Sequence, residues 1–144
     1  RLARDPRVVS MERTNLRTLT SLPEPIQLAT LDLSFISLRL VLPAVRRLLA
    51  RDGQVMALVK PQFEAGKAAV PRGGVIRDPA VHASVLERFA VNAAAAGFGL
   101  AGLIRSPIVG GDGNVEFLGH LVEPPGMAPE ALAKRIRVVA APSG

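Results

Sequence analysis

Hydrophobic and polar residues follow two kinds of pattern along the chain, and each pattern predicts one kind of secondary structure. Apolar side chains recur at helical spacing over residues 37–50, with arginines on much of the opposite face. A second helix is expected over residues 79–96, because Asp78 is a suitable N-cap and Gly97 a suitable stop. A short basic helix is expected near residues 129–138.

The second pattern, short apolar runs bounded by turn residues, predicts strands. Residues 26–33 follow a proline-containing breaker, and residues 54–60 form a continuous apolar run, which is typical of a central parallel strand. Residues 98–105 and 115–122 flank a glycine-rich turn at residues 110–113, so this pair is expected to form an antiparallel hairpin. No helix follows that turn to supply a dipole, so we interpret it as a hairpin turn and not as a phosphate-binding loop.

This alternation of strands and helices predicts an α/β fold. The sheet should be mostly parallel, covered by helices on both faces, and closed by an antiparallel hairpin. Such an ending is typical of the methyltransferase variant of the Rossmann-like fold. Residues 8–11 form a further short β-prone run, which precedes these elements.

Composition narrows the classes of function. The 144 residues are 49% hydrophobic and 21% charged, which indicates a globular domain and argues against disorder. Cysteine is absent, which excludes disulfides, zinc–cysteine sites and thiol catalysis. His82 and His120 are far apart, so no metal site is expected, and we expect His82 to pack or cap. No apolar run reaches the roughly 18 residues of a membrane span, and no signal peptide is recognisable, so the expected location is the cytoplasm.

The charge of the chain is compatible with two explanations. The formal net charge is +6, and 15 of the 18 basic residues are arginine. A coding bias can explain the excess of arginine. A polyanionic partner such as RNA, held through its phosphates, explains it equally well. The chain has five Phe and neither Tyr nor Trp, which argues against stacked bases as the main mode of nucleic-acid binding.

Three ionisable residues are expected to meet at one edge of the predicted sheet. Asp32 and Lys60 stand at the carboxyl ends of two parallel strands, where open α/β sheets bind ligands. Glu116 begins the last strand, and an antiparallel strand starts at that same edge. Each residue by itself is also compatible with a solvated strand end. No serine has a histidine in plausible register, so a hydrolase triad has little support.

Five stretches of sequence occur in the order found in a known family. They are ERTNLR (12–17), DLSFISLRLVLPA (32–44), VKPQFEAG (59–66), GGVIRDPAVH (73–82) and GNVEFL (113–118). Together they resemble the TlyA, or hemolysin A, family of FtsJ-like ribosomal RNA 2′-O-methyltransferases, which use S-adenosylmethionine. The resemblance covers about residues 1–122 and implies ribosomal RNA or a ribosomal subunit as the partner.

The resemblance also implies roles for the edge residues. Asp32, Lys60 and Glu116 match the Asp, the second Lys and the Glu of the family's Lys-Asp-Lys-Glu tetrad. A ribose 2′-hydroxyl is a poor nucleophile and must lose its proton as it attacks the methyl group. We therefore expect Lys60 to act as general base, with the two carboxylates orienting it. Asn15 and Leu16 match positions that border the cofactor's adenine, and Asp32 is a further cofactor contact.

The loop after the second parallel strand is expected to face the RNA. Lys67, Arg72 and Arg77 lie in this loop, beside the proposed site, and should contact phosphate. A solvated basic loop is the alternative interpretation.

The chain also departs from the family's pattern. The glycine-rich first strand and loop, the second strand and the first tetrad Lys all precede Arg1 in the family. With the family's sheet order 3-2-1-4-5-7-6, strands 1 and 2 would be lacking, so the strand that ends near Asp32 would be an exposed edge and residues 8–11 would be unpaired. Residues 1–124 are then the C-terminal portion of the methyltransferase domain, and residues 125–144 a short helical tail. We expect the chain alone to bind the cofactor weakly or not at all.

Other functions are compatible with these residues. The chain is expected to be either part of an active enzyme or an inactive, binding-only fragment of one. A base amino-methyltransferase would carry an Asp/Asn-Pro-Pro-aromatic motif at residues 32–35, where both prolines are missing, which favours oxygen as the acceptor. Membrane lysis, which the name hemolysin suggests, has no amphipathic or spanning segment to support it.

Overall fold

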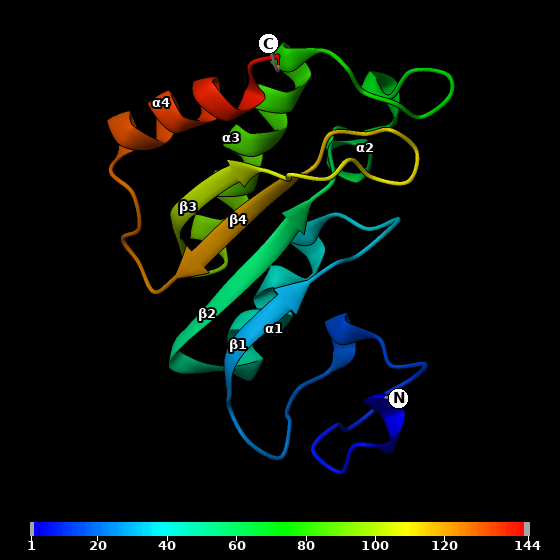
Figure 1. The fold of residues 1–144 in the computed structure, drawn as a ribbon. Coiled ribbons are helices and arrows are strands. Elements are labelled where there is room, and N and C mark those ends of the chain that lie inside the picture. The colour runs from blue at the N-terminus through cyan, green and yellow to red at the C-terminus, as the bar shows by residue number, and fades with distance from the viewer. Residues whose placement is uncertain (1, 143–144) are drawn as a thin grey trace.

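The computed structural model describes residues 2–142, and Figure 1 labels its helices and strands. Arg1 and residues 143–144 of the expected tail lie outside the described residues. The helices are α1 (Leu42–Leu48), α2 (Pro61–Glu64), α3 (Pro79–Ala95) and α4 (Pro129–Ala140). The strands are β1 (Ile26–Leu31), β2 (Leu49–Val59), β3 (Gly99–Arg105) and β4 (Phe117–Val122). Four short 3-10 helices are η1 (Leu2–Arg4), η2 (Leu16–Thr18), η3 (Leu38–Leu40) and η4 (Lys67–Ala69).

The four described strands form one sheet in the order β1-β2-β4-β3. β1 runs parallel to β2, whereas β4 runs antiparallel to both β2 and β3. The predicted α/β class and the closing hairpin are confirmed, although within residues 2–142 the β1–β2 pair is the only parallel pairing. β1 is an edge of the described sheet, as expected, and residues 8–11 pair with no described strand.

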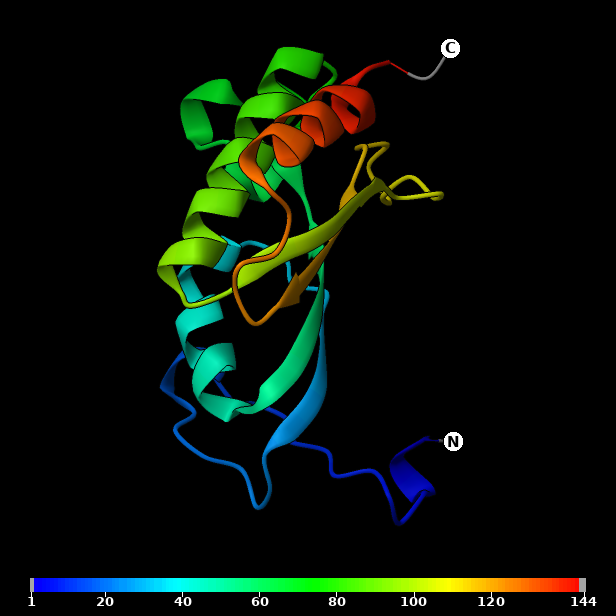
Figure 2. The same ribbon diagram turned by 90° about the vertical axis from the view of Figure 1, so that its left-hand side faces the viewer.

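Helices α1 and α3 cover the same face of the sheet (Figure 2). Each is the connection between two strands, and both connections cross on that side. The prediction that helices cover both faces is therefore wrong for the described residues. Side chains alternate along a strand, and the opposite face keeps exposed apolar residues such as Leu28, Met56 and Ile104.

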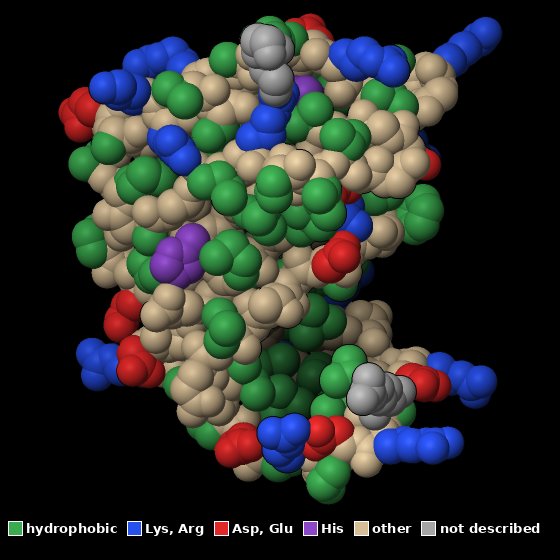
Figure 3. All heavy atoms as spheres, in the orientation of Figure 1, with side chains coloured by type: hydrophobic (Ala, Val, Ile, Leu, Met, Phe, Trp, Pro, Cys, Tyr) green, Lys and Arg blue, Asp and Glu red, His purple; other side chains and the backbone are tan. Residues whose placement is uncertain are grey.

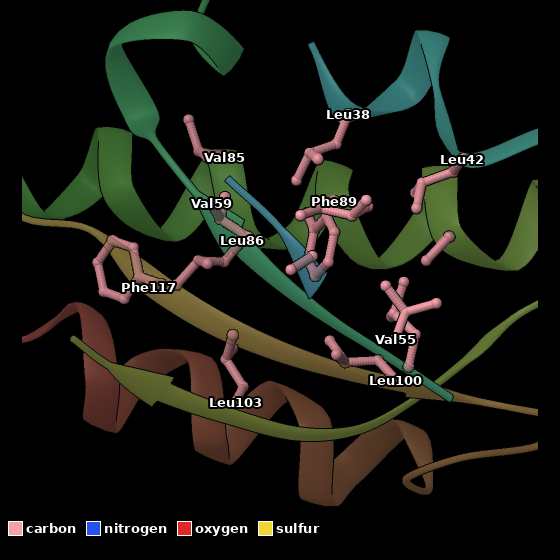
Figure 4. Close-up of a cluster of buried hydrophobic side chains, with 14 of the residues drawn as sticks. Leu38, Leu42, Val55, Val59, Val85, Leu86, Phe89, Leu100, Leu103 and Phe117 are labelled. Atoms are coloured by element: carbon pink, nitrogen blue, oxygen red, sulfur yellow. The ribbon is translucent and has the colours of Figure 1, made fainter. Parts of the chain in front are cut away.

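The buried core lies between the sheet and these helices, and Figure 4 labels ten of its side chains. It is mainly aliphatic, as the composition predicts, with Phe89, Phe98 and Phe117 buried among the Leu and Val residues. Gly119 on β4 leaves space for one of these rings, since a Cβ there would stand 2.5 Å from Cε1 of Phe89. Fully burying one such Leu, Val or Phe side chain contributes about 1.5–3 kcal/mol.

The predicted helix over residues 37–50 is shorter than expected. Pro43 has no N–H to donate, so it fits a helix only in the first turn, and α1 accordingly begins at Leu42. After α1 the chain enters β2 at Leu49, and the pairing of β2 with β1 shifts register next to Ile26. Gly53 lies in this irregularity, where a Cβ would stand 2.8 Å from the carbonyl oxygen of Ile26.

The later elements are close to their predictions. Asp78 caps α3, with its Oδ1 accepting a hydrogen bond of 2.9 Å from the backbone N–H of Ala80. Gly97, at φ +89°, follows the end of α3. α4 packs against α3 and β3, and Arg135 Nε donates to the carbonyl of Leu103 at 2.6 Å, so the tail helix shares the main core. Among residues 2–142, no helix has the length and apolar character needed to cross a membrane.

Candidate active site

The structure brings the three predicted ionisable residues to one edge of the sheet. Asp32 directly follows β1, Lys60 directly follows β2, and Glu116 directly precedes β4. Val59 pairs with Phe117 across the β2–β4 ladder, so Lys60 and Glu116 occupy the next opposed positions. Because Val59 and Phe117 face the helices, strand alternation directs Lys60 and Glu116 to the other side of the sheet.

Lys60 is held by two oxygen atoms from the loop after β1. Its Nζ lies 2.6 Å from Oδ1 of Asp32 and donates to the hydroxyl of Ser34 at 3.2 Å. The Lys60 side chain is 13% exposed, whereas that of Asp32 is 75% exposed. Pairs with this much exposure contribute at most about 1 kcal/mol to stability, so the consequence of the contact is orientation of the amine. The amine nitrogen has three directions besides its bond to Cε, so the contacts with Asp32 and Ser34 leave one direction for a substrate hydroxyl.

Glu116 is the buried member of the edge. It is 8% exposed, and among residues 2–142 no ion pair within 4.0 Å joins it to Lys60. Its backbone carbonyl accepts a hydrogen bond of 2.8 Å from the N–H of Ser106, so the β3–β4 hairpin continues to this residue. Gly110 lies against its carboxylate, because a Cβ there would stand 2.6 Å from Oε1 of Glu116.

Glu64, which the sequence did not single out, joins the two loops that follow β1 and β2. It lies on α2, directly after Lys60, and accepts hydrogen bonds from the Ser37 hydroxyl at 2.7 Å and the Leu38 N–H at 2.8 Å. Burial raises the pKa of Glu64 above the ordinary glutamate value, against the effect of these hydrogen bonds and of Arg88 and Arg39. No local signal reveals this clamp, since its partners are far apart in sequence.

The basic loop is anchored from the hairpin turn. Asn114 is completely buried, and its Oδ1 accepts a hydrogen bond of 3.0 Å from the Ile76 N–H. Its Nδ2 donates to the carbonyl of Gly74 at 2.9 Å. The glycine-rich pattern predicts a turn here but does not single out Asn114, although a turn that ends in Asn is a weak signal of such a bond.

The three basic residues expected to meet RNA all lie on this anchored loop. Lys67, Arg72 and Arg77 are exposed, and within the described part of the chain none forms an ion pair. Lys67 borders a cavity of about 410 Å³ that is also lined by Gln62, Phe63, Gly66 and Val70. Their charges are therefore available to a polyanion.

His82 packs as expected. It is 2% exposed, meets the Phe117 ring edge-on with 5.4 Å between centroids, and its Nε2 lies 3.1 Å from the Ile76 carbonyl oxygen. Its Nδ1 is buried and has no hydrogen-bond partner among residues 2–142. Burial lowers the pKa of His82 below the ordinary value of 6.5. The neighbouring Arg105 lowers it further, while the Ile76 carbonyl and Asp78 act in the other direction.

Asn15 and Leu16 lie in the N-terminal segment. Asn15 caps η2, with its Oδ1 accepting from the Arg17 N–H at 3.0 Å, which leaves its amide N–H₂ for another acceptor. Leu16 lines an apolar cavity of about 210 Å³ beside β1 and α1. Figure 3 shows this hollow, bordered by hydrophobic side chains, between the N-terminal segment and the sheet.

Phe35 is a feature of the site that composition did not suggest. It is 89% exposed and has φ +62°, which is a strained conformation for a bulky residue. Its ring lies 4.9 Å from that of Phe63, with 52° between the ring planes. The loop after β1 thus presents a flat apolar surface to solvent three residues after Asp32.

Comparison with known proteins gives consistent matches. Residues 1–122 match the family described as FtsJ-like methyltransferase. YqxC of Bacillus subtilis (strain 168), named as a candidate rRNA methyltransferase, is 54% identical over 127 residues, which are 84% of this chain and 44% of YqxC. The 16S/23S rRNA (cytidine-2′-O)-methyltransferase TlyA of Mycobacterium tuberculosis is 48% identical over 120 residues, which are 81% of this chain and 44% of TlyA.

A solved structure shares the fold. A protein of Streptococcus thermophilus, described as a candidate hemolysin, superposes with a TM-score of 0.87 at 42% identity. The match covers 96% of this chain and 52% of that one. The chain thus spans about half the length of the relatives it matches.

Proposed function

Since this chain belongs to the FtsJ-like methyltransferase family, we propose that it carries the part of an enzyme that activates a ribose 2′-hydroxyl of ribosomal RNA for methylation. The observation that carries the proposal is the Lys60 amine, held by Asp32 and Ser34 at the sheet edge where Glu116 also lies. The name of the TlyA relative supports ribosomal RNA as the substrate. We further propose that the enzyme acts in the cytoplasm and that ribosomes or their subunits are its partners.

The proposed chemistry is a proton transfer coupled to a displacement. S-adenosylmethionine, when bound, supplies a methyl group on a sulfonium sulfur, so formation of the oxygen–carbon bond and cleavage of the carbon–sulfur bond balance in one step. Lys60, as the neutral amine, takes the proton of the 2′-hydroxyl while the hydroxyl oxygen attacks the methyl group. Asp32 and Ser34 keep the amine in place, and the Glu116 carboxylate adds negative charge at the same edge of the sheet. Alignment of the hydroxyl with the methyl group supplies much of the acceleration.

The residues present fit one side of such a cofactor. The exposed Asp32 carboxylate suits a cationic sulfonium, and the free amide N–H₂ of Asn15 suits an acceptor on an adenine edge. Leu16 offers an apolar wall. The adjoining cavity of about 210 Å³ is smaller than the roughly 300–1,000 Å³ typical of ligand sites, which supports the expectation that residues 1–144 alone bind the cofactor weakly.

The RNA is proposed to approach over the two strand-end loops. Lys67, Arg72 and Arg77 would bind phosphates, which fix position without reading sequence. Phe35 offers the face of an exposed ring near Lys60, against which one base can stack. The sequence argues against stacked bases as the main mode of binding. A single stacked base beside the phosphate contacts is compatible with that expectation, because one exposed ring is enough to stack one base.

The test is methyl transfer by the complete gene product that carries this chain. Replacing Lys60 with Ala should lower kcat for transfer of labelled methyl groups to ribosomal RNA by about 10²–10⁴-fold, the usual contribution of a general base. Lys134→Ala removes the same side chain from an exposed position on α4 and should leave kcat unchanged. Full methylation by Lys60→Ala would contradict the proposed role.

The product distinguishes this proposal from base methylation. A 2′-O-methyl group makes the adjoining phosphodiester resistant to alkali, whereas methylation of a base leaves it labile. An alkali-labile methylated product would replace the proposed function with that of an amino-methyltransferase. Binding of RNA without any methyl transfer would instead support a binding-only role.

A further inference from the structure

We propose that Gly110 is a positioning residue whose missing side chain sets the place of the Glu116 carboxylate; the catalytic meaning of this inference rests on the proposed function. A Cβ at residue 110 would stand 2.6 Å from Oε1 and 3.0 Å from Cδ of Glu116. Real Cβ atoms essentially never approach another heavy atom so closely, so an alanine at this position requires something to move.

The turn around Gly110 is braced, so the carboxylate is the part that moves. The Gly110 N–H donates to the Asn114 carbonyl at 2.9 Å, and the Gly113 N–H donates to the Gly110 carbonyl at 2.8 Å. Asn114 is itself anchored by its side-chain hydrogen bonds to the loop of residues 74–76. By contrast, the contact on Glu116 is with the end of a flexible side chain, whose rotation costs little stability.

Gly110 is therefore expected to matter for activity more than for folding. An alanine would push the carboxylate away from its place in the edge that Lys60 and Asp32 share. A displacement on the order of 1 Å in a catalytic group can lower a rate about 100-fold.

Gly111 provides a matched control in the same turn. Apart from its two chain neighbours, no described residue places a heavy atom within 4 Å of a Cβ built at residue 111, whereas a Cβ at residue 110 meets Glu116. Neither glycine has a φ in the left-handed range, so alanine is compatible with the backbone at both positions. The two substitutions thus differ chiefly in the contact with Glu116.

The experiment compares Gly110→Ala with Gly111→Ala in the complete gene product, using methyl transfer to ribosomal RNA. Gly110→Ala should lower kcat by about 10–100-fold with little change in KM for RNA, and Gly111→Ala should change neither. Thermal unfolding is measured for both variants, and each should remain folded, because the clash involves only a side-chain end.

A double-mutant cycle isolates the contact. Glu116→Asp shortens the side chain by one methylene and withdraws the carboxylate from Gly110. In the Glu116→Asp background, Gly110→Ala should therefore cause little further loss of kcat, so the two effects are not additive. If Gly110→Ala merely weakened the fold, it would lower kcat equally in the wild-type and Glu116→Asp backgrounds.

The outcomes separate the two proposals. Equal kcat for the Gly110→Ala and Gly111→Ala variants, or additive losses in the cycle, would overturn the positioning role while the proposed function stands. A wild-type protein without methyl transfer would overturn the proposed function, and with it the catalytic meaning of Gly110. In that case the melting temperatures of the same four variants still show whether Gly110 and Glu116 are coupled in the fold.

Discussion

Asn114→Ala should destabilise the protein more than a typical polar substitution. The change removes the hydrogen bonds from the Ile76 N–H and to the Gly74 carbonyl, at a residue that is completely buried. Each hydrogen bond contributes about 0.5–1.5 kcal/mol, and a buried group left without a partner costs about 1–3 kcal/mol. The expected loss is therefore about 2–4 kcal/mol.

This loss translates into a measurable shift of Tm. An unfolding entropy of about 2.1 cal/mol/K per residue, applied to 144 residues, is about 0.3 kcal/mol/K, so the expected decrease in Tm is about 7–13 °C. Calorimetry of the complete gene product would follow the transition of this domain. Binding of ribosomal RNA should weaken as well, since Asn114 holds the loop that carries Arg72 and Arg77.

Asn15→Ala is the matched control for this prediction. It makes the same chemical change at an exposed cap with a single side-chain hydrogen bond, so its cost should be about 1 kcal/mol or less. If Asn114→Ala shifted Tm no more than Asn15→Ala, the reasoning from buried hydrogen bonds would be refuted.

Two further predictions concern pH and charge. The pKa of His82 is lowered in the folded protein, so its contribution to stability is present above the unfolded value of about 6.5 and is lost as the pH falls through the folded value. Tm should therefore fall between pH 7 and pH 5 by more in the wild type than in His82→Gln, and equal slopes would exclude the effect. Reversing the charges of Lys67, Arg72 and Arg77 to Glu should weaken RNA binding and flatten its salt dependence. The same charge reversal at Lys134 and Arg137 on α4 is the control. If the salt dependence of RNA binding were unchanged in the loop variant, Lys67, Arg72 and Arg77 would be a solvated basic loop without a role in RNA binding.

The elements of the fold could largely be predicted because their signals are local. The cap at Asp78, the stop at Gly97 and the turn between β3 and β4 each depend on a few neighbouring residues. The errors arose where a non-local constraint prevailed. The apolar spacing over residues 37–50 predicts one helix, but Pro43 delays its start and pairing with β1 draws Leu49 into β2.

The site was predictable to a similar degree. Strand order places Asp32, Lys60 and Glu116 at one edge, and topology can be inferred from a sequence. The contacts of Glu64 with Ser37 and of Gly110 with Glu116 depend on how loops fold over that edge. Such contacts join residues with no periodic relation to each other, so no pattern in the sequence reveals them.

The clamp at Glu64 has a consequence for motion at the site. A site assembled from the ends of separate strands loses alignment when each loop fluctuates by itself. Here one carboxylate binds the loop after β1 while it belongs to the helix that directly follows Lys60. We therefore expect the loops that carry Asp32 and Lys60 to move together, so that their fluctuations change the separation of amine and carboxylate little. The precision of the chemistry then depends on a side chain that need never touch a substrate.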